Sequence, residues 1–404
     1  MNNRNEVSGL SRTQFLPPPL PTERTVLGLA PEYARWQAEE PVVRVRLPDG
    51  NQPWLVTRYA DARAVLAHPA FSADGTRPGF PGTRAKVRPR GPGQFQLMDA
   101  PDHTRLRRAL IPEFGHRRIQ GLRDQLQRIA DELIDTMTAD GATNADLVAA
   151  YALPIPMLAI CRLLGVPYED SAFFETKYRV VTSLDTEPAE ALAAREELYA
   201  YLGDLLALRR EDPADDLISR LAARTEITPE ESVGMLSLLL AAGHDTTANM
   251  LSMAVISLLH DPDGLAALQA DPARWPAAVE ELLRQLSVIH AGLRRVAVED
   301  TEIGGTPIRA GDGVVVSLQI ANRDPAAFRG VTHELDLARD AGHHLAFGHG
   351  PHQCIGQSLA RLELHAGLAT LFRRLPDLRL AAPVEGLELS RSAVHGVRTL
   401  PVSW

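Results

Sequence analysis

The stretch Phe347-Gly348-His349-Gly350-Pro351-His352-Gln353-Cys354-Ile355-Gly356 decides how this chain is interpreted. Because the sequence contains only two cysteines, neither a disulfide framework nor a four-cysteine zinc site is available, and Cys354 is predicted to be a lone thiolate ligand of a metal. Gly348, Gly350 and Gly356 are expected to let the backbone turn tightly and approach a flat cofactor. A helical pattern begins after Gly356, so the sulfur would lie near a helix N-terminus, which lowers the pKa of a thiol. The alternative is a structural cysteine buried in a glycine-rich turn.

This segment resembles the haem-binding loop of the cytochrome P450 haem-thiolate monooxygenases, whose pattern is Phe-Gly-x-Gly-x-His-x-Cys-x-Gly. A match at all the fixed positions arises by chance in a chain of this length with a probability on the order of 10⁻⁶. The resemblance implies that Cys354 is the axial ligand of a haem b iron, that O2 is bound there, and that no flavin or NAD is tightly bound. It also places Phe347, Gly348 and Gly356 against the haem.

A second informative segment is an apolar helix predicted from Ser232 to His260. Its middle, Ala241–Thr247, contains the acid Asp245 and the hydroxyl of Thr246, and polar groups that contradict a buried pattern mark functional or strained sites. Gly243 is expected to let the helix open and leave room for a diatomic ligand. The alternative is that Thr246 bonds back to the carbonyl four residues earlier while Asp245 faces a polar gap.

The same segment resembles the oxygen-activating helix of the family, with pattern Ala/Gly-Gly-x-Asp/Glu-Thr. The resemblance implies that Asp245 delivers protons from solvent and that the Thr246 hydroxyl hydrogen-bonds dioxygen. Ala242 and Gly243 would then contact the cofactor.

A carboxylate and a guanidinium three residues apart, Glu281 and Arg284, can form a salt bridge on one helix. The spacing alone is common on solvated helix faces. In this order before Cys354 it resembles the family's Glu-x-x-Arg helix, which secures the segment that leads to the haem loop. Glu334 stands where the family's third, basic residue is more usual, which leaves His333 and Arg339 as candidates.

Haem propionates need cationic or donor partners where they are partly buried. His103 and Arg107 are four residues apart on one helix face and resemble the family's propionate-binding helix. Arg295 resembles its strand arginine, and His352 its histidine two residues before the thiolate. Arg294 competes with Arg295, because adjacent strand residues point to opposite faces.

The composition is that of a globular chain, with 404 residues, 45% of them hydrophobic, and a net charge of −9 that argues against nucleic-acid binding. Residues 1–22 are expected to form an extended lead-in, and 23–404 a single domain. That domain is expected to be mainly α-helical with a small sheet region, the helical prism that the resemblance implies. Strands are predicted at Val42–Leu47 and Trp54–Thr57, around Val296–Ile303 and Gly313–Leu318, and as a last pair at the C-terminus. The N-terminus from Met1 to Leu16 has no apolar run long enough for a signal peptide or membrane anchor, and no other segment reaches ~18 uninterrupted apolar residues, so a cytoplasmic protein without membrane contact is expected.

The resemblance implies a monooxygenase that inserts one oxygen atom of O2 into a small organic molecule, by hydroxylation or epoxidation. We expect a natural-product intermediate as substrate, as in antibiotic biosynthesis. The length fits the haem domain alone, so a ferredoxin and its reductase are the expected electron donors of a monomer. Phenol coupling, peroxide-driven oxidation and a non-catalytic haem-thiolate gas sensor remain as alternatives. The expected substrate-pocket residues include Ile289, His290, Val394 and His395.

Overall fold

The computed structural model describes residues 17–20, 24–82, 91–182, 186–390 and 394–404, and most of these residues are helical. The helices are α1 (Pro31–Glu39), α2 (Tyr59–Ala67), α3 (Asp102–Leu110), α4 (His116–Gln120), α5 (Arg123–Met137), α6 (Pro154–Leu164), α7 (Ser171–Thr182), α8 (Pro188–Glu211), α9 (Leu217–Ala222), α10 (Pro229–Leu259), α11 (Pro262–Ala270), α12 (Trp275–Leu286), α13 (Leu318–Ala321) and α14 (Gln357–Arg374). The strands are β1 (Val42–Arg44), β2 (Trp54–Val56), β3 (Phe71–Ser72), β4 (Asn144–Asp146), β5 (Leu293–Ala297), β6 (Thr301–Ile303), β7 (Thr306–Ile308), β8 (Gly313–Val316), β9 (Arg379–Leu380) and β10 (Pro401–Ser403).

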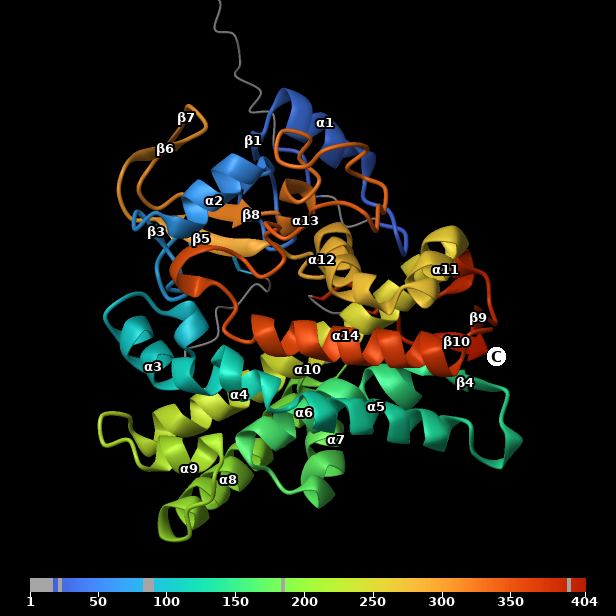
Figure 1. Ribbon diagram of the computed structural model, residues 1–404. Coiled ribbons are helices and arrows are strands. Elements are labelled where there is room, and N and C mark those ends of the chain that lie inside the picture. The colour runs from blue at the N-terminus through green and yellow to red at the C-terminus, as the bar shows by residue number, and fades with distance from the viewer. Residues whose placement is uncertain (1–16, 21–23, 83–90, 183–185, 391–393) are drawn as a thin grey trace, which may run out of the picture.

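The long apolar helix α10 organises the helical part of the molecule. It begins at a capping box in which the Thr228 side chain accepts from the Glu231 amide and the Glu231 side chain accepts from the Thr228 amide. Its 31 residues span about 46 Å. Met250–Leu258 are all buried, because α10 contacts α6, α8, α12 and α14 on different sides. Figure 1 shows α10 and α14 crossing the centre of the molecule.

The principal sheet has five strands in the order β1-β2-β8-β5-β3 and lies at one side of the helices (Figure 1). β2 pairs in parallel with β8, whereas β1–β2, β8–β5 and β5–β3 are antiparallel. The register pairs Arg295 with Val314 and Arg294 with Val315. This register determines which of the two arginines points into the interior.

Two smaller sheets complete the fold. The antiparallel pair β6–β7 turns through Gly304 and Gly305, whose φ angles of 54° and 82° favour glycine. β10 lies antiparallel between β4 and β9, so the expected C-terminal strand pair is present. Of the expected lead-in, residues 1–16 and 21–22 lie outside the described residues, and Pro19 forms a bridge with Arg46. None of the described helices is both long and apolar enough to cross a membrane.

Candidate functional site

The loop before α14 folds around two glycines. Gly348 and Gly350 have φ angles of 72° and 73°, which side chains rarely adopt. A Cβ on Gly350 would also lie only 2.6 Å from the carbonyl oxygen of Leu66. The Cys354 amide donates to the carbonyl of Phe347 at 2.8 Å and closes the loop. Gly356 differs from expectation, because its φ is −81° and an added Cβ would meet nothing closer than 3.9 Å.

The sulfur of Cys354 lies inside the fold and is nevertheless accessible. The side chain is exposed, while desolvation by the surrounding protein raises the pKa of its thiol. Both observations hold if the sulfur lines an interior hollow. Burial outweighs the groups that lower this pKa, which are the Gly356 amide, Arg107 and Arg361.

Ala242 is the second exposed residue at an interior position. It lies midway along α10, between the buried residues Leu240 and His244. An exposed alanine between buried residues of an apolar helix is expected where a flat cofactor packs against that helix. Together with the accessible sulfur of Cys354, this exposure fits a haem.

The four expected propionate partners converge from three elements. His103 of α3 and His352 of the loop have ring centroids 4.0 Å apart, and Arg107 donates from Nη2 to the Gln353 carbonyl at 2.5 Å. Arg295 of β5 is 5% exposed. The competing Arg294 instead donates to the carbonyl of Pro81 at 3.2 Å.

This basic cluster lacks matching negative charge among the described residues. Burial, Arg107 and Arg295 lower the pKa of His103, against which only Asp99 acts. Burial and the same neighbouring charges lower the pKa of His352 to about 3, and burial lowers that of Arg295 to about 10. The buried Nε2 of His103 has no hydrogen-bond partner within the part of the chain described. The two carboxylates of a haem would supply the negative charge that this cluster lacks and a hydrogen-bond acceptor for His103.

The acid and the alcohol of α10 differ in detail from expectation. The helix is continuous through Gly243 and does not open there. A Cβ at Gly243 would lie 3.4 Å from Cγ1 of Ile160 on α6, which is an ordinary van der Waals contact, so the packing of α6 does not require glycine here. Thr246 donates from Oγ1 to the Ala242 carbonyl at 2.8 Å, which is the bond to the carbonyl four residues earlier that was given above as the alternative. Asn249 donates from Nδ2 to the Asp245 carboxylate at 2.9 Å.

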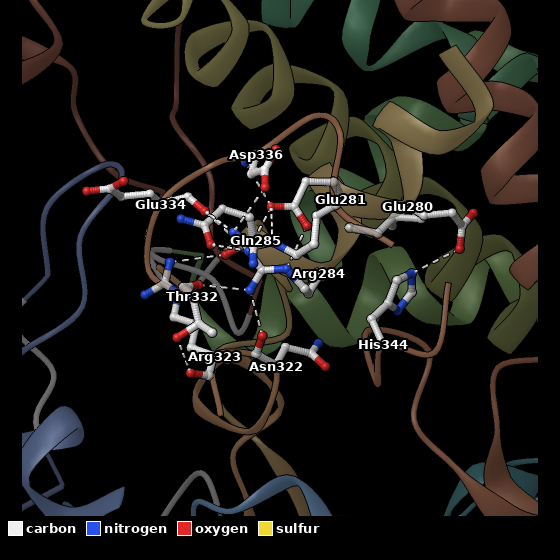
Figure 2. Close-up of polar contacts among 12 residues, drawn as sticks. Glu280, Glu281, Arg284, Gln285, Asn322, Arg323, Thr332, Glu334, Asp336 and His344 are labelled. Carbon is white, nitrogen blue, oxygen red and sulfur yellow. Dashed lines mark hydrogen bonds and ion pairs between the residues drawn. The ribbon is translucent and has the colours of Figure 1, made fainter. Parts of the chain in front are cut away.

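Glu281 and Arg284 form a fully buried pair, shown in Figure 2. Arg284 donates from Nε and Nη2 to the two carboxylate oxygens at 2.6 and 2.8 Å. Its Nη1 donates to the carbonyls of Asn322 and Thr332 at 2.7 and 2.9 Å. The pair therefore holds the chain that runs from α13 towards the haem loop.

Arg339 is the third arm of this network. Its Nε donates to Glu281 Oε1 at 3.1 Å, and its side chain is 4% exposed. The other candidate, His333, has a side chain that is 74% exposed. Glu334 contributes through its backbone, whose carbonyl accepts from Arg284 Nη2 at 3.3 Å. Figure 2 shows the Glu334 side chain pointing away from the pair.

The expected substrate-pocket residues lie together, and the ring of one of them, His395, contacts a backbone carbonyl. Ile289 and Val394 form an isolated antiparallel bridge, and the rings of His290 and His395 are 6.2 Å apart. The His395 ring Nε2 lies 2.8 Å from the carbonyl of Val26, and burial lowers its pKa to about 4. This geometry favours a structural role for His395.

Sequence reasoning missed Glu363 of α14, a carboxyl that is 2% exposed. Burial raises its pKa to about 8, although a hydrogen bond with Thr247 of α10 acts in the opposite direction. A signal existed, because Glu363 falls on the apolar stripe with Leu359 and Ala366. A surface hollow of about 1260 Å³ between α4, the end of α6 and the segment that joins α8 to α9 includes none of the expected site residues.

Comparison with known proteins finds similarity along nearly the whole chain. The Cytochrome P450 family model matches residues 275–376. Cytochrome P450-SU2 of Streptomyces griseolus is 50% identical over 379 residues, which cover 93% of each chain. The 20-oxo-5-O-mycaminosyltylactone 23-monooxygenase of Streptomyces fradiae is 42% identical over 95% of this chain and 92% of its own. The crystal structure of cytochrome P450 MoxA from Nonomuraea recticatena superposes with a TM-score of 0.89 at 43% identity and covers 96% of this chain and 98% of its own.

Proposed function

We propose, from the premise that this chain belongs to the cytochrome P450 family, that it inserts one oxygen atom of O2 into a natural-product intermediate. The mainly helical haem-thiolate fold and the monooxygenase class expected from the sequence are confirmed by this membership. The observation that carries the proposal is the accessible interior sulfur of Cys354 beside an uncompensated basic cluster.

The cofactor that fits this site is haem b. When bound through a cysteine thiolate, haem supplies the activation of dioxygen and the push that favours cleavage of its O–O bond. The Cys354 thiolate would hold the haem iron, and Phe347, Gly348, Gly356, Ala242 and Gly243 would contact the haem. His103, Arg107, Arg295 and His352 would hold the propionates, because they form a cluster of donors without matching acceptors.

Asp245 and Thr246 would move protons at the distal face. Thr246 Oγ1 donates to the Ala242 carbonyl in this structure, so the O–H must turn about the Cβ–Oγ1 bond before it can donate to dioxygen. The Asp245 carboxylate is only half-buried and is held by Asn249, which lets it exchange protons with solvent and pass them towards the Thr246 hydroxyl.

The substrate class and the electron donors belong to the same proposal. The Streptomyces fradiae relative is named for monooxygenation of a mycaminosyltylactone, which supports a natural-product intermediate here. Electrons would come from a separate ferredoxin and its reductase, and the enzyme would act as a cytoplasmic monomer without a tightly bound flavin or NAD. Ile289, His290 and Val394 would line the substrate pocket, and His395 would support it structurally through its contact with the Val26 carbonyl.

Turnover under ¹⁸O2 tests the proposal. The holoenzyme would be reconstituted with a surrogate ferredoxin, its reductase and NADPH, and offered compounds that shift its haem spin state. We expect one ¹⁸O atom per product molecule. A product that lacks two hydrogens and carries no ¹⁸O would instead establish oxidative coupling. NADPH consumption at the protein-free rate with every compound would indicate a binding protein.

A further inference from the structure

A tyrosine from another helix contacts the oxygen helix at the turn that carries its acid and alcohol. The Tyr178 hydroxyl, on α7, donates to the carbonyl of Ala241 on α10 at 2.9 Å. Ala241 is four residues before Asp245, and in an α-helix its carbonyl also accepts the Asp245 amide. Tyr178 therefore shares an acceptor with the backbone of the acid itself.

Two successive carbonyls of this turn thus accept an additional hydroxyl. The Ala242 carbonyl accepts Thr246 Oγ1 at 2.8 Å from within the helix, and the Ala241 carbonyl accepts Tyr178 from outside it. A carbonyl oxygen has two lone pairs and can accept both donors. The position of α7 consequently bears on the backbone geometry of Asp245.

α7 packs chiefly on α8, and the Tyr178 hydroxyl joins it to α10 as well. A small cavity of about 10 Å³, the lower limit for one water, lies beneath Phe174 and Tyr178 of α7. Its other walls come from α6, α8 and α10, namely Met157, Leu198, Leu202, Ser237 and Leu240. The hydrogen bond from Tyr178 therefore adds a polar link between α7 and α10 beside this small cavity.

The residues around Tyr178 keep its hydroxyl protonated and hold its ring in place. Burial raises the pKa of its phenol, and the nearby charge of Asp245 raises it further, so the hydroxyl keeps its proton. The buried His244 ring meets the Tyr178 ring edge-on, with centroids 5.8 Å apart and planes at 83°. Burial lowers the pKa of His244 to about 4, so this ring is neutral and packs as an aromatic.

We propose that Tyr178 is a positioning residue that couples the seating of α7 to the geometry of the Ala241–Thr246 turn, and so to proton delivery by Asp245 and Thr246. When α7 is seated, the hydroxyl holds the Ala241 carbonyl and the turn is fixed. When α7 moves away, the turn loses this donor and the acid is less well placed. The inference rests on the proposed monooxygenase function.

The test is Tyr178→Phe, which removes only the hydroxyl, with Tyr151→Phe as the matched control. Tyr151 is also buried and also donates to a helix carbonyl, that of Gly367 on α14, at 2.8 Å. Two readouts are compared. One is amide hydrogen exchange at Asp245 and Thr246 in the ferric, substrate-free holoenzyme, and the other is product formed per NADPH with a substrate.

We expect Tyr178→Phe to speed exchange at Asp245 and Thr246 about threefold to tenfold, as loss of one hydrogen bond would. Product per NADPH should fall at least about twofold, with the peroxide yield rising accordingly. Tyr151→Phe should leave both readouts as in the wild type. Unchanged exchange at these two amides, or equal effects of both variants, would overturn the proposal. A wild type that yields no oxygenated product would instead overturn the proposed function, a result seen without any variant.

Discussion

Replacing Glu281 by glutamine tests how much the buried network stabilises the fold. The change keeps the side-chain shape but removes a charge that neutralises two guanidiniums, those of Arg284 at 2.6 Å and Arg339 at 3.1 Å. All three side chains are at most 4% exposed, so water cannot replace the lost partner. Breaking such a buried pair costs about 3–5 kcal/mol. For 404 residues with an unfolding entropy of about 2.1 cal/mol/K each, that loss lowers Tm by roughly 4 to 6 °C.

The assay is urea unfolding of the purified holoenzyme, followed by both circular dichroism and haem absorbance. Glu388→Gln is the matched control, because it makes the same chemical change in a pair with Arg398 whose side chains are 69% and 52% exposed. That surface pair should contribute no more than about 1 kcal/mol. The haem signal of Glu281→Gln should fall at or before the backbone signal, since the network holds the chain leading to the haem loop. A Glu281→Gln protein no less stable than Glu388→Gln would refute this reasoning.

Three further predictions concern the site. Thr246→Ala should lower product per NADPH severalfold and release peroxide, whereas unchanged coupling would remove the hydroxyl from proton delivery. Arg295→Leu should speed haem transfer to apomyoglobin about tenfold or more, the effect of losing one charge-assisted hydrogen bond; the neighbouring Arg294→Leu should not, and equal rates would count against the propionate assignment. Burial raises the pKa of Glu363 from 4.5 to about 8, so the native state binds the extra proton and stability should fall as pH rises between these values. Glu363→Gln should flatten that decline in urea midpoints, and an unaltered slope would show that Glu363 does not titrate as described.

The structural features that could be predicted from the sequence are those encoded by a local pattern of residues. The loop at Cys354 and the helix predicted from Ser232 to His260 carry glycine spacing and apolar periodicity, and the helix lies at Pro229–Leu259. Strand boundaries were less accurate. The run predicted as a strand around Val296–Ile303 is divided between β5, which begins at Leu293 because it pairs with β8 from there, and β6 at Thr301–Ile303. The Val42–Leu47 run ends as a strand at Arg44.

Features that depend on tertiary contacts could not be read from the sequence. The third arm is Arg339 rather than His333, because the path of the chain after α13 buries one and exposes the other. Gly243 was expected to open α10, but the helix continues unbroken through it. The contact of Tyr178 with Ala241 joins segments 63 residues apart, which no local pattern encodes.

The most direct test of the central claim is the absorption spectrum of the dithionite-reduced protein after addition of carbon monoxide. Wild type and Cys161→Ser, which changes the other, buried cysteine, should both have the strongly red-shifted Soret band of thiolate-ligated haem. Cys354→Ser should lose it. A wild-type band typical of histidine-ligated haem, or a red-shifted band that persists in Cys354→Ser, would contradict the account.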